Sequence, residues 1–151
     1  MSHLPVNHHL RTVYRVVAGL CGLYVLVLGI AGFGRAAQAT FFARDGVPWT
    51  LGLPVNRAFA MLSIVAGATI LVGAVLGRNV ARWVNLVGGT VFLTAGLVTM
   101  MVLRTSLNPF GFTMTTCIVS FLLGLVLLSA GLYGQVGPLP RMPRSSTVEH
   151  G

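Results

Sequence analysis

The chain has very little charge, no lysine and almost no acid. Only 8% of its 151 residues are charged; the acids are Asp45 and Glu149, and all ten basic residues are arginine. An ordinary soluble domain carries about 25% charged residues, whereas this chain is 55% hydrophobic with a mean hydropathy of +0.86. Binding of nucleic acid needs basic residues gathered on a soluble face. Here the arginines separate apolar runs, so the sequence predicts a membrane protein that binds no nucleic acid.

A second absence concerns the inside of those apolar runs, which contain no Asp, Glu, Lys or His. Proton relays, ion-coupled carriers and sites for charged substrates in membranes usually use such groups. The histidines lie in the tails, and no nucleophile with a base, no phosphate loop and no metal-ligand spacing is present. The sequence therefore predicts a protein that is not an enzyme, with no catalytic residue, no cofactor and no metal site.

The cysteines form no Cys-x-x-Cys motif. Cys21 and Cys117 belong to different apolar runs. With a rise of about 1.5 Å per residue in a core about 30 Å thick, they are expected about 12 Å apart in depth. A disulfide needs Cα atoms within about 7 Å. We predict two free, buried cysteines; loss of an activity on replacing either one would be the minimum support for a redox role.

Four apolar runs are long enough to cross a membrane, which takes about 20 helical residues. The predicted fold class is therefore an all-α integral membrane protein, a bundle of four transmembrane helices. Arg15 and Arg57 lie near the ends of their runs, where they can extend to the lipid headgroups. The predicted spans cover residues 13–33, 57–76, 83–103 and 112–133.

The predicted domain organisation is a four-span membrane domain over residues 11–136 with a flexible tail on each side. The tails, residues 1–10 and 137–151, have too little apolar surface to fold alone. An outer loop covers residues 34–56, and a short link runs from Arg78 to Arg82.

The outer loop is unusually apolar. Asp45-Gly46 predicts a turn, and an alternation of apolar residues that begins at Val47 and ends at Leu53 predicts a short extended segment. We expect the loop to cover the outer mouth of the bundle or to lie among the headgroups.

The arginines predict the orientation. Four spans put both termini on one side, together with six arginines, against four arginines on the other side. Positive residues favour the cytoplasm, so we predict cytoplasmic termini and a multi-pass protein of the plasma membrane, the bacterial inner membrane. The predicted membrane-interface residues are Tyr14, Arg57, Trp83 and Tyr133.

A cleaved signal peptide is the alternative interpretation of the first span. Ala37-Gln38-Ala39 resembles a cleavage site. The apolar core before it is longer than the roughly 7 to 15 residues of a signal peptide, which favours a span that stays in the membrane.

Small residues recur at every fourth position of the spans. Residues four apart share a helix face, and small side chains let backbones approach closely where lipid offers no hydrophobic drive for association. They predict a compact bundle, or in part a face for a partner subunit. The predicted helix-packing residues are Gly22, Thr69, Gly73, Gly77, Gly89, Ser120 and Gly124.

Two further groups of polar residues have candidate roles. Asn56 and Asn108 precede spans and are candidate helix N-caps. Hydroxyl groups at depth are candidates to line a small-molecule or quinone pocket, although serine and threonine also bond to their own helix. The hydroxyl residues are Tyr24, Ser63, Thr90, Thr94 and Thr99.

The segments LGLPVNRAFAMLSIVAGATILVG and WVNLVGGTVFLTAGLV resemble a bacterial family of small four-span membrane proteins, domain of unknown function 4383. The resemblance covers about residues 13–134 and implies the four-span fold and a plasma-membrane location. It also implies histidines in relatives near Phe59 and Ser63, and an Asp or His near residues 111–116.

The sequence predicts a small non-enzymatic membrane protein that is an accessory or scaffold subunit of a larger membrane assembly. The expected partners are membrane lipids and either other membrane protein subunits or further copies of the chain. The alternative is a carrier or binding protein for a neutral or lipid-like molecule. That alternative requires a membrane-level cavity of about 300 Å³ or more.

Overall fold

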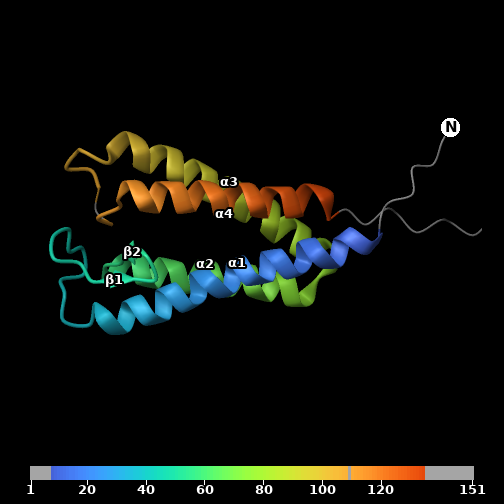
Figure 1. Ribbon diagram of the computed structural model, residues 1–151, viewed down its shortest axis with the longest axis horizontal. Coiled ribbons are helices and arrows are strands. Elements are labelled where there is room, and N and C mark those ends of the chain that lie inside the picture. The colour runs from blue at the N-terminus through green and yellow to red at the C-terminus, as the bar shows by residue number, and fades with distance from the viewer. Residues whose placement is uncertain (1–7, 109, 135–151) are drawn as a thin grey trace, which may run out of the picture.

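The computed structural model describes residues 8–108 and 110–134, which form a bundle of four helices (Figure 1). All four are long and apolar enough to cross a membrane, which confirms the predicted fold class. The sidedness of the termini stays a prediction, and residues 1–7 and 137–151 of the predicted tails lie outside the described residues. The helices are α1 (His8–Arg35), α2 (Arg57–Leu76), α3 (Arg78–Val102) and α4 (Met114–Tyr133).

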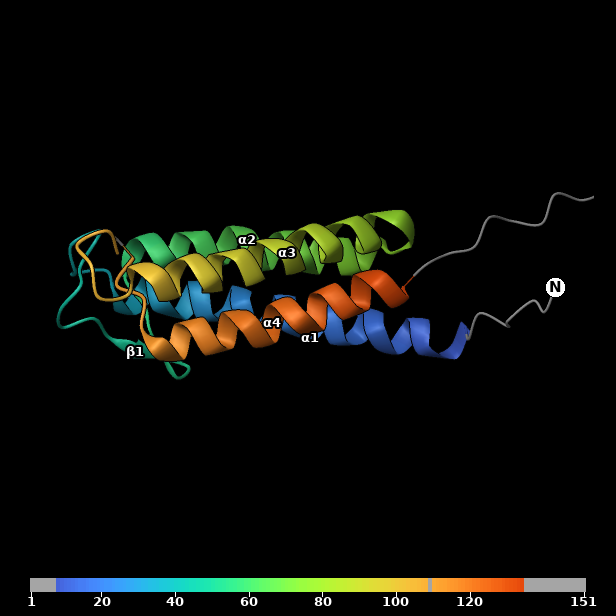
Figure 2. The ribbon, with the colours of Figure 1, turned by 90° about the horizontal axis from the view of Figure 1, so that it is seen from above.

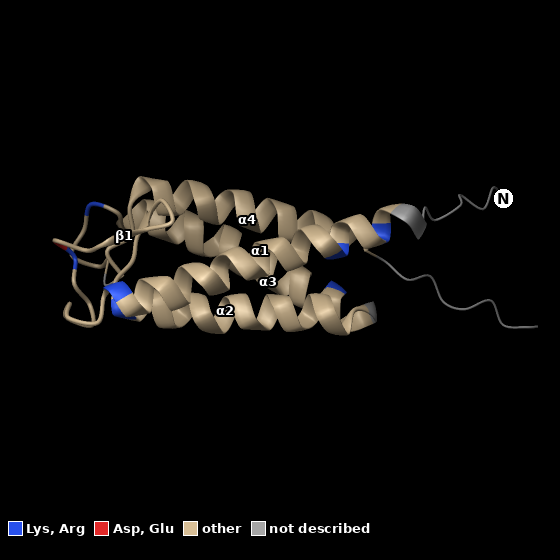
Figure 3. Ribbon diagram, turned by 60° about the horizontal axis from the view of Figure 1, so that its bottom comes forward, with Lys and Arg blue, Asp and Glu red and all other residues tan. Residues whose placement is uncertain are grey.

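The bundle has two different ends (Figure 2). At the terminal end, α1 begins, α4 ends and α2 joins α3; there the rings of Tyr14 and Tyr133 stack with centroids 5.8 Å apart. At the loop end lie the two longer connections, residues 36–56 and 103–113. The described arginines gather at these two ends and leave the middle of the helices uncharged (Figure 3).

The helices associate as two pairs, α1 with α2 and α3 with α4, and contact between the pairs is much less extensive. Glycines allow the first pair to approach closely. A Cβ on Gly67 would lie 2.3 Å from the backbone nitrogen of Leu26, and one on Gly22 would lie 2.9 Å from that of Leu71. The two backbones are therefore in direct contact, as expected when packing rather than hydrophobicity drives association.

The second pair is built in the same way. A Cβ on Gly89 would lie 2.6 Å from the backbone nitrogen of Leu128. Gly124 leaves room for Leu93, and Ser120 lies against Gly96. Three of the predicted packing residues thus lie between α3 and α4.

The two predicted packing residues within α2, Thr69 and Gly73, have different surroundings. Gly73 lies against Val84 of α3, 2.9 Å from where its Cβ would be. Thr69, expected on a packing face, is exposed, and its hydroxyl donates to the carbonyl of Val65 at 2.8 Å. The buried residues of α2 include Gly67, Ile70 and Gly73, so the four-residue spacing identified a buried position at Gly73 but not at Thr69.

Gly77 forms the joint between α2 and α3. Its φ of +65° is a left-handed conformation, and its N–H donates to the Gly73 carbonyl at 3.0 Å. The prediction of a link over Arg78–Arg82 is wrong, because α3 begins at Arg78. From α1, the Arg15 guanidinium donates to the carbonyls of Ala74 and Val75, which satisfies acceptors left open at the end of α2.

A small hairpin packs at the loop end of the bundle, where β1 contacts α1 and β2 contacts α4. Strands β1 (Trp49–Thr50) and β2 (Leu53–Pro54) pair antiparallel around a two-residue turn. The turn residues, Leu51 and Gly52, have φ of 49° and 88°, the left-handed values of a type I′ turn. The loop therefore contains the expected extended segment, and Leu53 is almost completely buried at the mouth of the bundle.

The two candidate N-caps differ. Asn56 caps α2, accepting a hydrogen bond from the Phe59 N–H at 2.8 Å, as predicted. Asn108 does not cap α4; its side chain closes the preceding loop by bonding both the N–H and the carbonyl of Phe112. The cap is Thr113, in a capping box with Thr116. Helix α4 therefore begins two residues after the start of the predicted span.

Replacing Gly67 with alanine tests the backbone contact between α1 and α2. The new methyl group has no space, so we expect a loss of about 1–3 kcal/mol in unfolding free energy. Thermal unfolding in a mild detergent, followed by circular dichroism, measures it. The matched control is Gly19→Ala in the same pair of helices, where a Cβ would lie 3.7 Å from its nearest neighbour, Ala74 Cβ. Equal stability of the two variants would contradict the contact.

Replacing Asn56 tests the cap of α2. The Asn56 side chain also donates to the Ala43 carbonyl at 3.1 Å, so Asn56→Ala should cost about 1–2 kcal/mol and loosen the outer loop. Unfolding temperature and the rate of tryptic cleavage after Arg44 report the two effects. Asn56→Ser keeps a capping oxygen and should recover part of the unfolding temperature, whereas a serine variant no more stable than the alanine variant would argue against capping.

Candidate functional site

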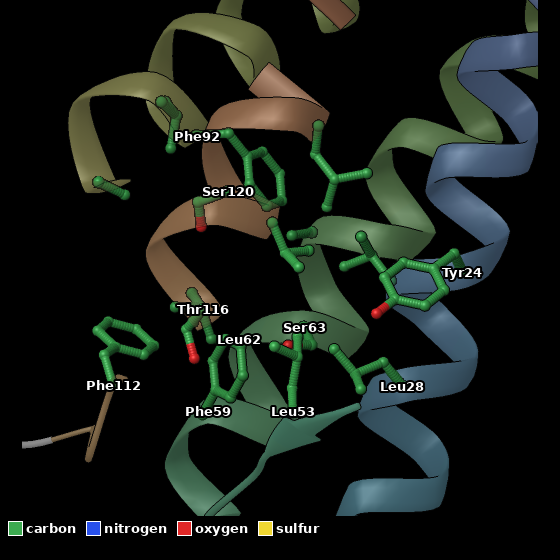
Figure 4. Close-up of a pocket in the computed structure, with 16 residues that line it drawn as sticks. Tyr24, Leu28, Leu53, Phe59, Leu62, Ser63, Phe92, Phe112, Thr116 and Ser120 are labelled. Atoms are coloured by element: carbon green, nitrogen blue, oxygen red, sulfur yellow. The ribbon is translucent and has the colours of Figure 1, made fainter. Parts of the chain in front are cut away.

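A cavity of about 120 Å³ lies inside the loop-end half of the bundle (Figure 4). Side chains from all four helices and from β2 line it, so it occupies the seam between the two helix pairs. Each pair is packed backbone to backbone, whereas the seam is filled by side chains alone. A gap is therefore expected here rather than inside either pair.

Aromatic and aliphatic side chains make most of the wall. The Phe59 ring of α2 meets the Phe112 ring, just before α4, edge to face with centroids 5.0 Å apart. Phe92 contributes from α3, and Leu53 of β2 closes the loop end of the cavity (Figure 4). The cavity is thus an apolar space held open by rigid rings at its edge.

Four hydroxyl groups give the cavity its polar contacts. Ser63 is 3% exposed, and within the described part of the chain neither its hydroxyl nor that of Ser120 forms a hydrogen bond. The Tyr24 hydroxyl donates to the Leu51 carbonyl at 3.2 Å, and the Thr116 hydroxyl belongs to the capping box of α4. Two hydroxyls at the cavity are therefore free to bond a guest.

The wall contains no ionisable acid or base apart from the Tyr24 phenol. Its residues offer dispersion contacts and neutral hydrogen bonds, which suit a neutral guest. A cavity of about 150 Å³ holds one benzene, so a volume of about 120 Å³ accommodates a small ring or a short piece of an acyl chain. This is below the volume that the carrier alternative requires.

The other candidate pocket residues lie elsewhere. Thr90 is exposed and donates to its own helix at the Leu86 carbonyl, 2.8 Å away. Thr94 is exposed, and Thr99 is buried without lining the cavity. Tyr24 and Ser63 are the two hydroxyl residues from the predicted set that reach it. Nothing in the sequence marks Phe59 and Phe92 as lining residues, because apolar residues are common in every span.

Both cysteines are free, as predicted. Cys117 is buried in α4, and Cys21 is half-buried in α1. Neither lines the cavity. Among the residues that the structure describes, no cluster of histidine, cysteine or acid side chains is suited to a metal ion.

The predicted interface residues lie at the ends of the bundle. Trp83 and Tyr133 are 66% and 70% exposed near the terminal end, and Tyr14 packs on Tyr133. At the loop end the Arg57 guanidinium lies 5.5 Å from the centre of the Phe33 ring. These positions suit amphipathic anchors at the two headgroup layers.

One family matches the chain, the domain of unknown function DUF4383, over residues 15–133. The chain belongs to this family. The match extends through all four helices, which confirms the resemblance seen in the sequence. No curated protein and no solved structure matches the chain. Membership of DUF4383, a domain of unknown function, assigns no activity to the chain.

The cavity also coincides with the positions at which the resemblance implies polar residues in other DUF4383 members. Phe59 and Ser63, where histidines are implied, both line it. Phe112 and Thr116, in the second implied region, line it as well. The two regions are far apart in the sequence but meet at one place in the fold, where this chain presents rings and hydroxyls.

Replacing Ser63 with alanine tests whether its hydroxyl is unpaired. Removal of a buried hydroxyl without a partner should leave the unfolding free energy unchanged or raise it by up to about 1 kcal/mol. Thermal unfolding of purified protein measures the change, with Thr116→Ala, which breaks the capping box, as a destabilising comparison. A clear destabilisation by Ser63→Ala would mean that the hydroxyl has a bound partner.

Proposed function

We propose that this DUF4383 protein is a non-enzymatic accessory or scaffold subunit of a larger assembly in the bacterial plasma membrane, with its terminal end in the cytoplasm. The chain is a small protein with four helices long and apolar enough to span a membrane, and it belongs to DUF4383. The subunit role rests mainly on one surface feature, a groove between α2 and α3.

The groove has a volume of about 380 Å³ and opens sideways from the bundle. On α2 its wall includes Ala66 and Thr69, and on α3 it includes Gly88 and the exposed ring of Trp83. The wall is almost wholly apolar. It therefore lies at the depth of the hydrocarbon core, with Trp83 near the terminal-end headgroups.

Small residues among those that line this groove favour a helix as its occupant. Gly88, Ala66 and Thr69 keep the two backbones accessible, and small residues are the ones that let transmembrane helices approach. The hydroxyl of Thr69 is already bonded to its own helix, so an apolar helix can cover it without loss of a hydrogen bond. We assign the groove to a transmembrane helix of a partner subunit; a second copy of this chain is the other occupant that the experiment distinguishes.

The arginines support the assigned orientation. Arg11, Arg15 and Arg82 lie at the terminal end, to which the sequence adds Arg78, Arg141 and Arg144. The loop end carries four arginines and Asp45. A surplus of arginine near the helix ends favours the cytoplasmic side.

Filling the groove tests the subunit role. A Cβ on Gly88 would make only ordinary contacts, 3.9 Å from Ile70 and Leu127, so Gly88→Phe should fold while its ring occupies the groove. After mild detergent extraction, we expect native mass measurement of the wild type to show a complex of defined mass. In Gly88→Phe the amount of this complex should fall at least about tenfold. A mass equal to two copies of the chain would identify a homodimer.

The matched control is Leu97→Phe, a substitution at a 53% exposed position of the same helix outside the groove. It should keep the complex. A monomeric wild-type protein, or a complex that both variants keep, would contradict the proposal.

The cavity is smaller than the volume of about 300 Å³ expected for a carrier, but it favours a second candidate of narrower scope, binding of a small neutral molecule or of a segment of a lipid-like one. The observation in its favour is that the hydroxyls of Ser63 and Ser120, which form no hydrogen bond within the described part of the chain, both line this partly open apolar space. The small volume restricts the guest to a ring or chain segment. The stability of Ser63→Ala bears on this candidate as well, because a guest bonded to the hydroxyl would make the substitution destabilising.

A further inference from the structure

The cavity beside Ser63 opens on the flank of the bundle formed by α2 and α3. Its exposed lining residues are Leu62 of α2 and Val91 and Ala95 of α3, whereas the lining residues of α1, α4 and β2 are buried or half-buried. The groove lies on the same flank, and Ala66, Val91 and Phe92 line both spaces. Val91 lies about half-way along α3, at the depth of the hydrocarbon core. A guest that enters here therefore comes out of the lipid.

The wall of the cavity favours an aromatic guest. The rings of Phe59 and Phe112 meet edge to face with centroids 5.0 Å apart, and Phe92 lines the cavity from α3 (Figure 4). Aromatic rings attract one another edge to face or offset-stacked, in addition to the gain from burying apolar surface. The volume of about 120 Å³ limits the buried part of the guest to about one ring.

The Ser63 hydroxyl lacks a partner that such a guest can supply. Ser63 is 3% exposed and lines the cavity, and within the described ranges its hydroxyl forms no hydrogen bond. Burial of an unpaired hydroxyl is unfavourable. A serine hydroxyl both donates and accepts, so one polar group on the ring satisfies it. In hydrocarbon that group has no water to bond instead, which favours its transfer to Ser63.

The surroundings exclude a charged guest. Among the residues that line the cavity, the Tyr24 phenol is the one ionisable group, and the described arginines lie at the two ends of the bundle (Figure 3). A charge buried in apolar surroundings without an opposite charge is strongly unfavourable. A phenol combines an aromatic ring with a hydroxyl that is neutral at physiological pH.

We propose that the cavity binds a membrane-dissolved phenol with a single aromatic ring. The ring lies against Phe59 and Phe92, and its hydroxyl is hydrogen-bonded to Ser63. Entry is between α2 and α3, and an apolar substituent on the ring extends through the opening into the lipid. This inference rests on the second candidate of the proposed function, binding of a small neutral molecule, and names the chemical class of that molecule.

Two probes of almost equal size test the class of the guest, para-fluorophenol and fluorobenzene. Fluorine NMR of the full-length protein in a mild detergent measures their binding, with concentrations counted per mole of detergent so that uptake by the micelle is the same in the comparison. We expect para-fluorophenol to bind about fivefold more tightly, which corresponds to one hydrogen bond. In Ser63→Ala the two probes should bind equally. Thr94→Ala removes an exposed hydroxyl outside the cavity and should keep the fivefold preference.

Replacing Ala95 with phenylalanine tests the opening. Ala95 is exposed and lines the cavity, so Ala95→Phe should fold while its ring obstructs the way in. Both probes should then bind about tenfold more weakly. The matched control is Leu97→Phe, an exposed position of α3 that does not line the cavity, and it should leave the binding unchanged.

The outcomes separate this inference from the candidate on which it rests. Binding of neither probe to the wild type would overturn both. Equal binding of the two probes to the wild type would overturn the assignment to a phenol and keep the second candidate. A preference that Ser63→Ala retains, or that Thr94→Ala loses to the same extent, would overturn the role of Ser63. Unchanged binding in Ala95→Phe would overturn entry between α2 and α3. The subunit role is tested separately, by the mass of the complex in Gly88→Phe.

Discussion

Direct contact between the backbones of α1 and α2, at Gly22 and Gly67, is the constraint on which the rest of the structure depends. Lipid chains are as apolar as the side chains that cover the helices, so burial of apolar surface contributes little to association. Close packing over glycine supplies the attraction instead. It also aligns α1 so that Arg15 reaches the last carbonyls of α2, a bond that a wider helix separation would prevent.

The division into two tight pairs explains where the openings of the molecule lie. The cavity beside Ser63 and the groove beside Gly88 are both gaps where one pair meets the other. Glycines within each pair let the two helix backbones touch. Between the pairs, larger side chains keep the backbones apart and leave the cavity and the groove. The arrangement that makes the bundle stable therefore also determines which surfaces remain for a guest or a partner.

The four spans were predictable because length and hydropathy together are sufficient for a membrane helix. The cap at Asn56 was predictable because a local side-chain bond needs only the right residue at the right offset. Thr69 and Asn108 show what local patterns leave open. A four-residue spacing fits several faces of a helix, and the side that meets its neighbour depends on contacts with another helix. Asn108 has an equally good bond within its own loop, so its residue type did not determine its role. The cavity could not be predicted, since Phe59 and Phe112 meet through the fold alone.

The single-residue joint at Gly77 also bears on how the chain enters the membrane. α2 and α3 are separated by Gly77 alone, with no loop between them. The chain between them is therefore too short for one helix to span the membrane while the other stays outside it. They form a helical hairpin with its closed tip at the terminal end, and we expect this hairpin to be inserted as a unit. We therefore expect a substitution that prevents one of the two from spanning to remove both, with α1 and α4 remaining as spans that leave the two termini on the same side of the membrane.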